Sequence, residues 1–221
     1  MDKLSNAAGI IAAAAMDQRG SLAKSLAAAK GVAQSEISQA TMEEFKTTVV
    51  RTLTPHASAI LLDTEFGLPA ANARAANAGL LLAYEKSGYD NTQPGRLPDL
   101  LPDLSVRRIK ELGADAVKIL IYYTPFDSSE VNTIKHAFIE RIGSECADQE
   151  IPFFLEFIGY DVDGKDEKGV EFAKLKPQVV LKSMAEFTKP RYKVDVLKVE
   201  VPVNAEYVEG SSVYKGATAY T

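Results

Sequence analysis

Residues 105–123, with the sequence SVRRIKELGADAVKILIYY, contain a complete helix–turn–strand unit. Ser105 is suited to be an N-cap, because its hydroxyl can accept a hydrogen bond from the first turn of a helix over Val106–Leu112. Gly113 ends that helix. The apolar run Ala116–Tyr123 has no polar alternation, which is typical of a strand buried on both faces of a parallel sheet. The unit therefore predicts an α/β fold.

Similar units recur along the chain. The other apolar runs are Gly9–Met16, Ser58–Leu62, Leu80–Ala83, Phe153–Ile158 and Val196–Val203. Most are separated by stretches of helical period. We expect one helix to begin at a capping box, Thr41 to Glu44, and to end near Pro55. Further helices are expected over Ser129–Cys146 and Val170–Phe187. The Pro- and Gly-rich segment Asn91–Asp103 predicts a surface loop. This βαβα series predicts a parallel sheet with helices outside it.

Composition narrows the class of protein. The chain has 221 residues, of which 46% are hydrophobic and 25% are charged, and this predicts an ordinary globular protein with a single domain over residues 1–221. The net charge is −5 and no dense basic run occurs, so we expect no nucleic-acid partner. One cysteine and two histidines are too few for a structural zinc site, so Cys146 is interpreted as a small buried hydrophobe.

The longest apolar run is Ala7–Met16, which is too short to cross a bilayer. Its start, Asp2-Lys3, is less basic than a signal peptide requires, although Ala12–Ala15 leaves a processing signal as an alternative. We therefore expect a cytoplasmic protein without a membrane partner.

Two α/β architectures fit six strands with intervening helices. A doubly wound nucleotide-binding fold usually has a glycine-rich first turn, whereas the first predicted strand here is followed by Asp17-Gln18-Arg19-Gly20. Polar residues instead recur in or after several strands, as in a (β/α)8 barrel, whose active site is assembled at the C-terminal ends of several strands. The sequence therefore favours a TIM barrel.

Three charged residues interrupt apolar strands and are candidates for chemistry. Lys198 lies in VLKVEVP; a desolvated amine there would be a nucleophile able to form a Schiff base with a ketone. The alternatives are a lysine that reaches solvent or an ion pair with Glu200. Lys118 lies in AVKIL and, if the barrel numbering holds, comes close to Lys198. Glu156, on the intervening strand, is a candidate proton shuttle or a structural partner of one lysine.

Asp17, Gln18 and Arg19 follow the first strand and offer a carboxylate, an amide and a guanidinium for hydroxyl and phosphate recognition. Such residues also simply end strands. The run Asp161–Gly164 is similar to the start of a calcium loop, but Asp166 stands at the sixth position, where such a loop has glycine, and Phe172 stands at the twelfth, where it has glutamate. His56 and His136 are interpreted as structural or solvated.

Seven motifs resemble the class I tagatose 1,6-bisphosphate aldolase family, in order, over nearly the whole chain. They are residues 16–20 (MDQRG), 61–63 (LLD), 66–69 (FGLP), 81–86 (LLAYEK), 140–146 (ERIGSEC), 151–156 (IPFFLE) and 195–204 (DVLKVEVPVN). The resemblance implies a TIM barrel and a reaction that uses no metal and no cofactor. It implies that Lys198 forms the Schiff base, that Glu156 is the general acid/base, that Lys118 is an active-site lysine, and that Asp17 and Gln18 contact substrate.

The resemblance also implies the substrate, a ketohexose 1,6-bisphosphate cleaved to dihydroxyacetone phosphate and glyceraldehyde 3-phosphate. Members of that family continue for about a hundred further residues, and a barrel needs eight strands, so this chain is expected to be truncated, with about six β/α units. Two alternative functions stay open: an aldolase for a related phosphorylated or sulfonated ketose, and a non-catalytic metabolite-binding regulator. A homo-oligomer is a possible assembly for each of these functions.

Overall fold

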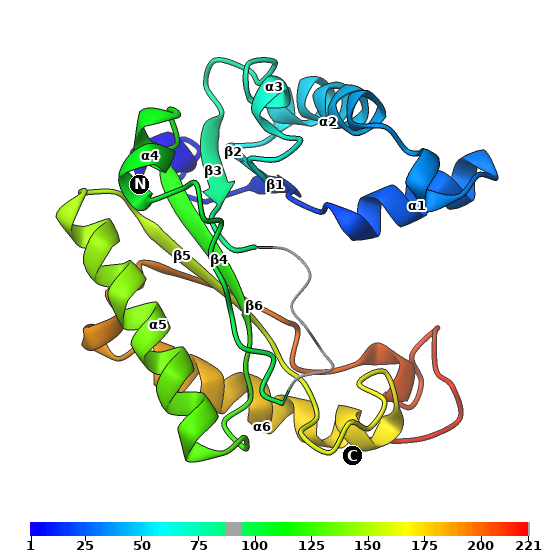
Figure 1. Cartoon of the computed structure of the whole chain (residues 1–221). Coiled ribbons are helices and arrows are strands. Elements are labelled where there is room, and N and C mark those ends of the chain that lie inside the picture. The colour runs from blue at the N-terminus through cyan, green and yellow to red at the C-terminus, as the bar shows by residue number, and fades with distance from the viewer. Residues whose placement is uncertain (87–93, 221) are drawn as a thin grey trace. The chain divides into compact units, whose positions relative to one another are not determined.

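The computed structural model describes residues 1–86 and 94–220 (Figure 1). In that part of the chain the strands are β1 (Ala13–Met16), β2 (Ala59–Leu62), β3 (Gly79–Ala83), β4 (Ala116–Tyr122), β5 (Phe153–Ile158) and β6 (Val196–Val199). The α-helices are α1 (Gly20–Lys30), α2 (Gln39–Leu53), α3 (Leu68–Ala71), α4 (Val106–Glu111), α5 (Ser129–Asp148) and α6 (Val170–Phe187). Short 3₁₀ helices cover Asp2–Leu4, Gln34–Glu36, Thr54–His56, Pro190–Tyr192 and Ala205–Tyr207.

The strand order is β1-β2-β3-β4-β5-β6, so each strand follows its predecessor both in the chain and in the sheet. β1 pairs in parallel with β2, β2 with β3, β3 with β4, and β5 with β6. A doubly wound sheet reverses its strand order at a switch point, and this order has no reversal. The strands therefore belong to part of a (β/α)8 barrel, as the sequence predicted.

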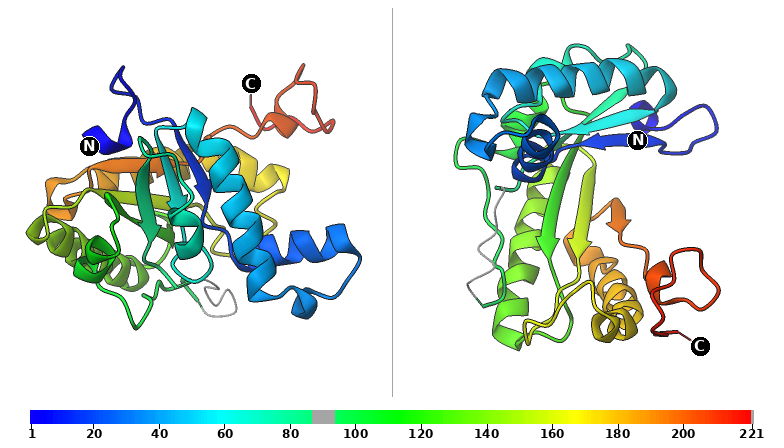
Figure 2. Two further views of the ribbon diagram at one scale, coloured as in Figure 1. Left: turned by 90° about the horizontal axis from the view of Figure 1, so that it is seen from above. Right: turned by 90° about the vertical axis from the view of Figure 1, so that its right-hand side faces the viewer.

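The chain divides into two compact units, which are described separately. The first comprises Met1–Gly88, Asp99–Ile119 and Glu145–Phe153. Its core is formed by the fully buried strands β2 and β3, and α2 packs against β1 and α3 (Figure 2). The second comprises Tyr89–Pro98, Leu120–Ser144 and Phe154–Thr221, with α6 packed against β6. The prediction of a single domain over residues 1–221 stays a prediction.

Strands that are buried on both faces lie where the sequence predicts them. β5 has the predicted bounds, and β2, β3 and β4 differ from the prediction by one residue each. β1 begins four residues later than predicted, because Gly9 adopts a left-handed backbone (φ 74°) and the Ala12 N–H donates to the Ser58 hydroxyl. β6 ends at Val199 rather than Val203, and the predicted run includes Pro202, which has no N–H to donate to a neighbouring strand.

The helix signals are also mostly confirmed. Ser105 Oγ accepts from the Arg108 N–H and caps α4 as predicted, and α6 has the predicted bounds. The cap expected at Thr41 is wrong. Ser38 is the N-cap of α2, and its Oγ accepts from the Thr41 N–H at 3.2 Å. α1 and α3 were not predicted.

Three further expectations concern Cys146, membrane-spanning helices and the long loop. Cys146 is buried, as expected. In the described residues no helix is both long enough and apolar enough to cross a membrane. Residues 91–93 of the expected loop lie outside the described residues, and residues 94–103 form turns and one isolated bridge, Glu85 to Leu100.

Candidate active site

The first cluster of charged side chains surrounds Lys118 in the first unit. Lys118 lies on β4 and is 1% exposed, so it is not a solvated lysine on an outward face. Its ammonium donates to Asp17 Oδ2 at 2.8 Å and to Glu85 Oε1 at 2.9 Å. Two carboxylates thus compensate one buried cation, which would otherwise be costly to bury.

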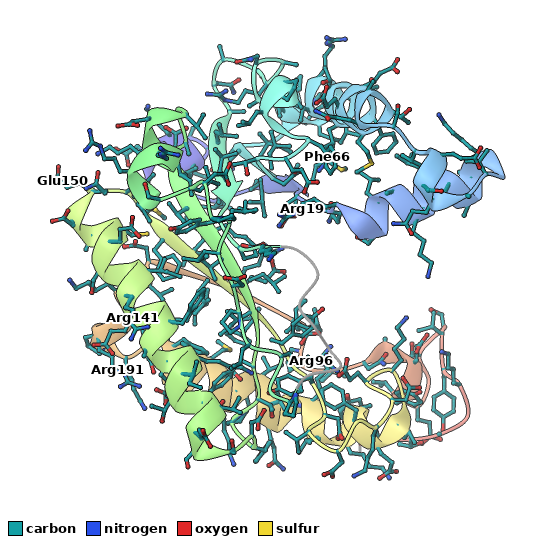
Figure 3. The ribbon with its side chains drawn as sticks, in the orientation of Figure 1. Arg19, Phe66, Arg96, Arg141, Glu150 and Arg191 are labelled. Atoms are coloured by element: carbon teal, nitrogen blue, oxygen red, sulfur yellow. The ribbon has the colours of Figure 1, made fainter. Side chains whose placement is uncertain are left out.

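Arg19 adds a second cation to this cluster. It is 7% exposed and lies where the chain leaves β1 and enters α1 (Figure 3). Its Nη2 donates to the Glu85 carbonyl oxygen at 2.9 Å and lies 3.8 Å from Glu85 Oε1. Its Nη1 is buried and has no hydrogen-bond partner among the described residues. A buried guanidinium nitrogen of this kind can still donate to an oxygen of a bound molecule.

Glu85 was quoted only as part of a motif, and its role was missed. It follows β3 and is 4% exposed. Burial raises the pKa of Glu85, and the Lys118 ammonium opposes this rise. Sequence alone does not predict the contact, because the direction in which the chain turns after a strand is set by packing.

Gln18 does not join the cluster through its side chain, which is exposed. Its carbonyl oxygen instead accepts a hydrogen bond from Lys46 on α2. Lys46 is fully buried and pairs with Asp63, which follows β2. Burial lowers the pKa of Lys46 more than the Asp63 carboxylate raises it. The available sequence signal was its spacing, since Met42, Lys46 and Val50 are the buried residues of α2, four apart.

The second cluster lies in the second unit, on β5 and β6. Glu156 and Lys198 are paired in the parallel register of these strands, and Lys198 Nζ lies 2.7 Å from Glu156 Oε1. Neighbouring side chains at one register position project from the same face, which is why the two meet. Glu200 is held elsewhere, by Lys176 at 3.1 Å and by the Gly159 N–H at 2.8 Å.

The expected desolvation of Lys198 is not observed. Its side chain is 45% exposed, whereas that of Glu156 is 16% exposed. β6 is the last strand in the order and pairs with β5 alone among the described strands, so its side chains keep contact with solvent. Lys118 belongs to the first unit and Lys198 to the second, and the predicted proximity of the two amines stays a prediction.

The two histidines, His136 and His56, were interpreted from the sequence as structural or solvated. His136 Nε2 lies 2.9 Å from the Tyr123 hydroxyl, and burial lowers the pKa of this histidine against the opposing charge of Glu186. His56 is exposed at the end of a 3₁₀ helix. Among the described residues, no three His, Cys, Asp or Glu side chains are arranged to hold a metal ion.

The second unit places an amine and a carboxyl group in contact on adjacent parallel strands, and these are groups that Schiff-base chemistry with a carbonyl substrate can use. Residues 11–219 match the model of the DeoC/LacD family aldolases. The chain belongs to the DeoC/LacD aldolase family.

Three curated relatives cover the whole chain. It is 57% identical to tagatose 1,6-diphosphate aldolase 2 of Enterococcus faecalis over 221 residues, or 65% of that protein. It is 57% identical to tagatose 1,6-diphosphate aldolase of Listeria monocytogenes over 221 residues, or 64% of that protein. It is 54% identical to the Streptococcus agalactiae protein of that name over 220 residues, or 66% of that protein. The chain thus spans just under two thirds of their length.

Solved structures agree with the fold. A Corynebacterium glutamicum protein aligns with a TM-score of 0.59 at 15% identity, covering 89% of this chain and 63% of the other. An archaeal fructose 1,6-bisphosphate aldolase aligns with a TM-score of 0.51 at 14% identity, covering 88% and 66%. At these identities the likeness concerns the fold alone.

Proposed function

We propose that this chain carries the lysine chemistry of a class I aldolase that cleaves a ketohexose 1,6-bisphosphate, with tagatose 1,6-bisphosphate as the preferred candidate. The observation that carries the proposal is the contact of 2.7 Å between Lys198 and Glu156 on paired strands. Support for the substrate comes from the names of the three relatives at 54–57% identity.

The proposed reaction begins with transfer of a proton from Lys198 to a base, for which Glu156 is in hydrogen-bond range. The free amine attacks the C2 ketone, and one of its N–H protons passes to the former ketone oxygen, which gives a neutral carbinolamine. Glu156 then protonates the departing hydroxyl, and water leaves as the iminium forms. The partial exposure of Lys198 leaves its amine accessible to the ketone carbon.

Cleavage uses the iminium as the acceptor of the electron pair. A base removes the proton of the C4 hydroxyl, the C3–C4 bond breaks, and its electrons form an enamine on Lys198. Glyceraldehyde 3-phosphate leaves. Protonation of the enamine at C3 and hydrolysis of the iminium release dihydroxyacetone phosphate and regenerate the amine. No step in this sequence uses a metal or a cofactor.

Asp17, Arg19 and Lys118 are proposed to bind hydroxyl or phosphate oxygens of the substrate. This proposal is supported by the buried Nη1 of Arg19 and by the two buried cations of the cluster. Gln18 is also proposed to contact the substrate, because its side chain is exposed and it directly follows Asp17. We also propose that a phosphorylated ketose is the small-molecule partner of this protein and that the protein is located in the cytoplasm.

The test is an enzyme-coupled assay of dihydroxyacetone phosphate release from tagatose 1,6-bisphosphate. The chain is compared with Lys198→Met and with the control Lys174→Met, an exposed lysine on α6. We expect release by the chain and by the control, insensitive to EDTA, and only background release by Lys198→Met. Turnover that survives Lys198→Met refutes the proposal. Binding of the sugar without turnover in every protein identifies a metabolite-binding relative instead.

A further inference from the structure

Lys46 is a buried charged residue that the proposed reaction does not use. It lies in the middle of α2 on the face that also carries Met42 and Val50, and its side chain is completely buried. A lysine in this position loses its hydration, so its ammonium needs compensation from nearby acceptors.

The ammonium of Lys46 has three hydrogen-bond acceptors. It donates to the Met16 carbonyl oxygen at 2.8 Å, to the Gln18 carbonyl oxygen at 2.8 Å and to Asp63 Oδ1. Three donors therefore meet three acceptors, and the two carbonyl groups belong to the residues on either side of Asp17.

Asp63 is itself held in place. Its Oδ2 accepts from the Phe66 N–H at 2.7 Å. A Cβ atom at Gly67 would lie 2.4 Å from the Asp63 carbonyl oxygen, so the turn closes tightly on Asp63. The carboxylate is thus fixed by its own turn, and it can fix Lys46 in return.

We propose that Lys46, anchored by Asp63, is a positioning residue that holds the backbone on both sides of Asp17 and thereby places the Asp17 carboxylate against the Lys118 ammonium. The contact that depends on it is the 2.8 Å hydrogen bond from Lys118 to Asp17. The catalytic meaning of this role rests on the proposed function, because it requires that Asp17 and Lys118 bind substrate.

A purely structural role is the competing explanation, since any buried ion pair that loses one partner destabilises the fold. The double variant Lys46→Met with Asp63→Asn separates the two roles. It removes both charges, and the asparagine oxygen can still accept from Phe66. We expect it to recover most of the melting temperature that Lys46→Met loses, because no buried charge is left without a partner. The Met16 and Gln18 carbonyls nevertheless remain without their ammonium.

The readout is the rate of trace acetylation of Lys118, measured by peptide mass spectrometry relative to the exposed Lys24 in the same sample. In the unaltered chain the Lys118 ammonium is shielded from solvent and lies between two carboxylates. Release of Asp17 should raise the relative rate by about tenfold in both the single and the double variant. Val50→Ala, a core change on the same helix, controls for loosening and should leave the rate unchanged.

An unchanged Lys118 rate in the double variant overturns the proposal, and so does an equal increase in Val50→Ala. Borohydride reduction with dihydroxyacetone phosphate is run on the unaltered chain in parallel. Failure of that reaction at Lys198 counts against the proposed function, whereas the acetylation of Lys118 needs no substrate and judges the positioning role by itself.

Discussion

Replacing Lys118 with methionine tests the charge balance of the first cluster. The substitution keeps most of the apolar stem and removes the ammonium that lies 2.8 Å from Asp17 Oδ2 and 2.9 Å from Glu85 Oε1. The side chains of Asp17 and Glu85 are 12% and 6% exposed, so water cannot fully replace the lost cation. Arg19, 3.8 Å from Glu85 Oε1, remains as a weaker partner.

The magnitude follows from these distances. With an effective dielectric constant of about 20, two unit charges about 3 Å apart attract by about 6 kcal/mol, part of which offsets their desolvation. Removal of one partner of a buried pair costs about 3–5 kcal/mol. We expect the free energy of unfolding to fall by that amount near pH 8.

The cost should depend on pH because Glu85 can accept a proton. Burial raises the pKa of Glu85 and Lys118 opposes the rise, so the variant raises this pKa further. When the folded-state pKa lies above the unfolded-state value, stability is fully present below the unfolded-state pKa and is lost as the pH rises through the folded-state pKa. The deficit of the variant should therefore be smallest near pH 5 and grow by up to about 1.4 kcal/mol per pH unit.

Urea unfolding followed by circular dichroism at pH 5, 6, 7 and 8 measures this deficit. Lys24→Met, an exposed lysine on α1, is the control and should stay within about 0.5 kcal/mol of the unaltered chain. A deficit that is the same at every pH, or that is below about 1 kcal/mol at pH 8, would refute the reasoning, since either result places solvent at Lys118.

Two more changes test other parts of the account. Gly67→Ala puts a Cβ atom 2.4 Å from the Asp63 carbonyl oxygen and 2.9 Å from Leu62 Cβ, and should cost about 1–3 kcal/mol in thermal unfolding. The control Gly20→Ala meets no atom within 4 Å and should be neutral or slightly stabilising; equal effects would contradict the packing argument. At Glu186, burial opposes ionisation, but hydrogen bonds from Lys189 and Tyr192 outweigh it and lower the pKa to about 2. Because this pKa is lowered, the carboxylate's contribution to the free energy of unfolding is present above the ordinary glutamate pKa and is lost as the pH falls towards 2. Glu186→Gln should therefore lower the free energy of unfolding by about 2 kcal/mol at pH 7 and by much less at pH 3. A loss of stability that is the same at both pH values would contradict this argument.

The sequence predicts the fold well where both faces of a strand are buried. β5 needs no context beyond its own apolar run, and Ser105 caps α4 because the capping contact is local. β1 was predicted too long, because an alanine-rich run gives little information on where pairing begins. The cap of α2 was misplaced by three residues, since Ser38 and Thr41 are both good caps and their hydroxyls lie within 3.0 Å of each other.

The candidate site was predictable where a charge interrupts an apolar strand. Lys118, Glu156 and Lys198 stand out for that reason, and the Glu156–Lys198 pairing follows from strand register. Lys46 was missed because a lysine within a helix usually faces solvent. Its burial depends on acceptors at Met16 and Gln18, which are about 30 residues away in the chain and come near only in the folded state.

The central claim is that Lys198 is the nucleophile, and imine trapping tests it most directly. The chain is incubated with dihydroxyacetone phosphate and sodium borohydride, which reduces an imine to a stable secondary amine, and is then digested and mapped by mass spectrometry. The account predicts a reduced adduct on the peptide that contains Lys198 and its loss in Lys198→Met. An adduct on a different lysine, or none on a chain whose circular dichroism shows it folded, would contradict the claim.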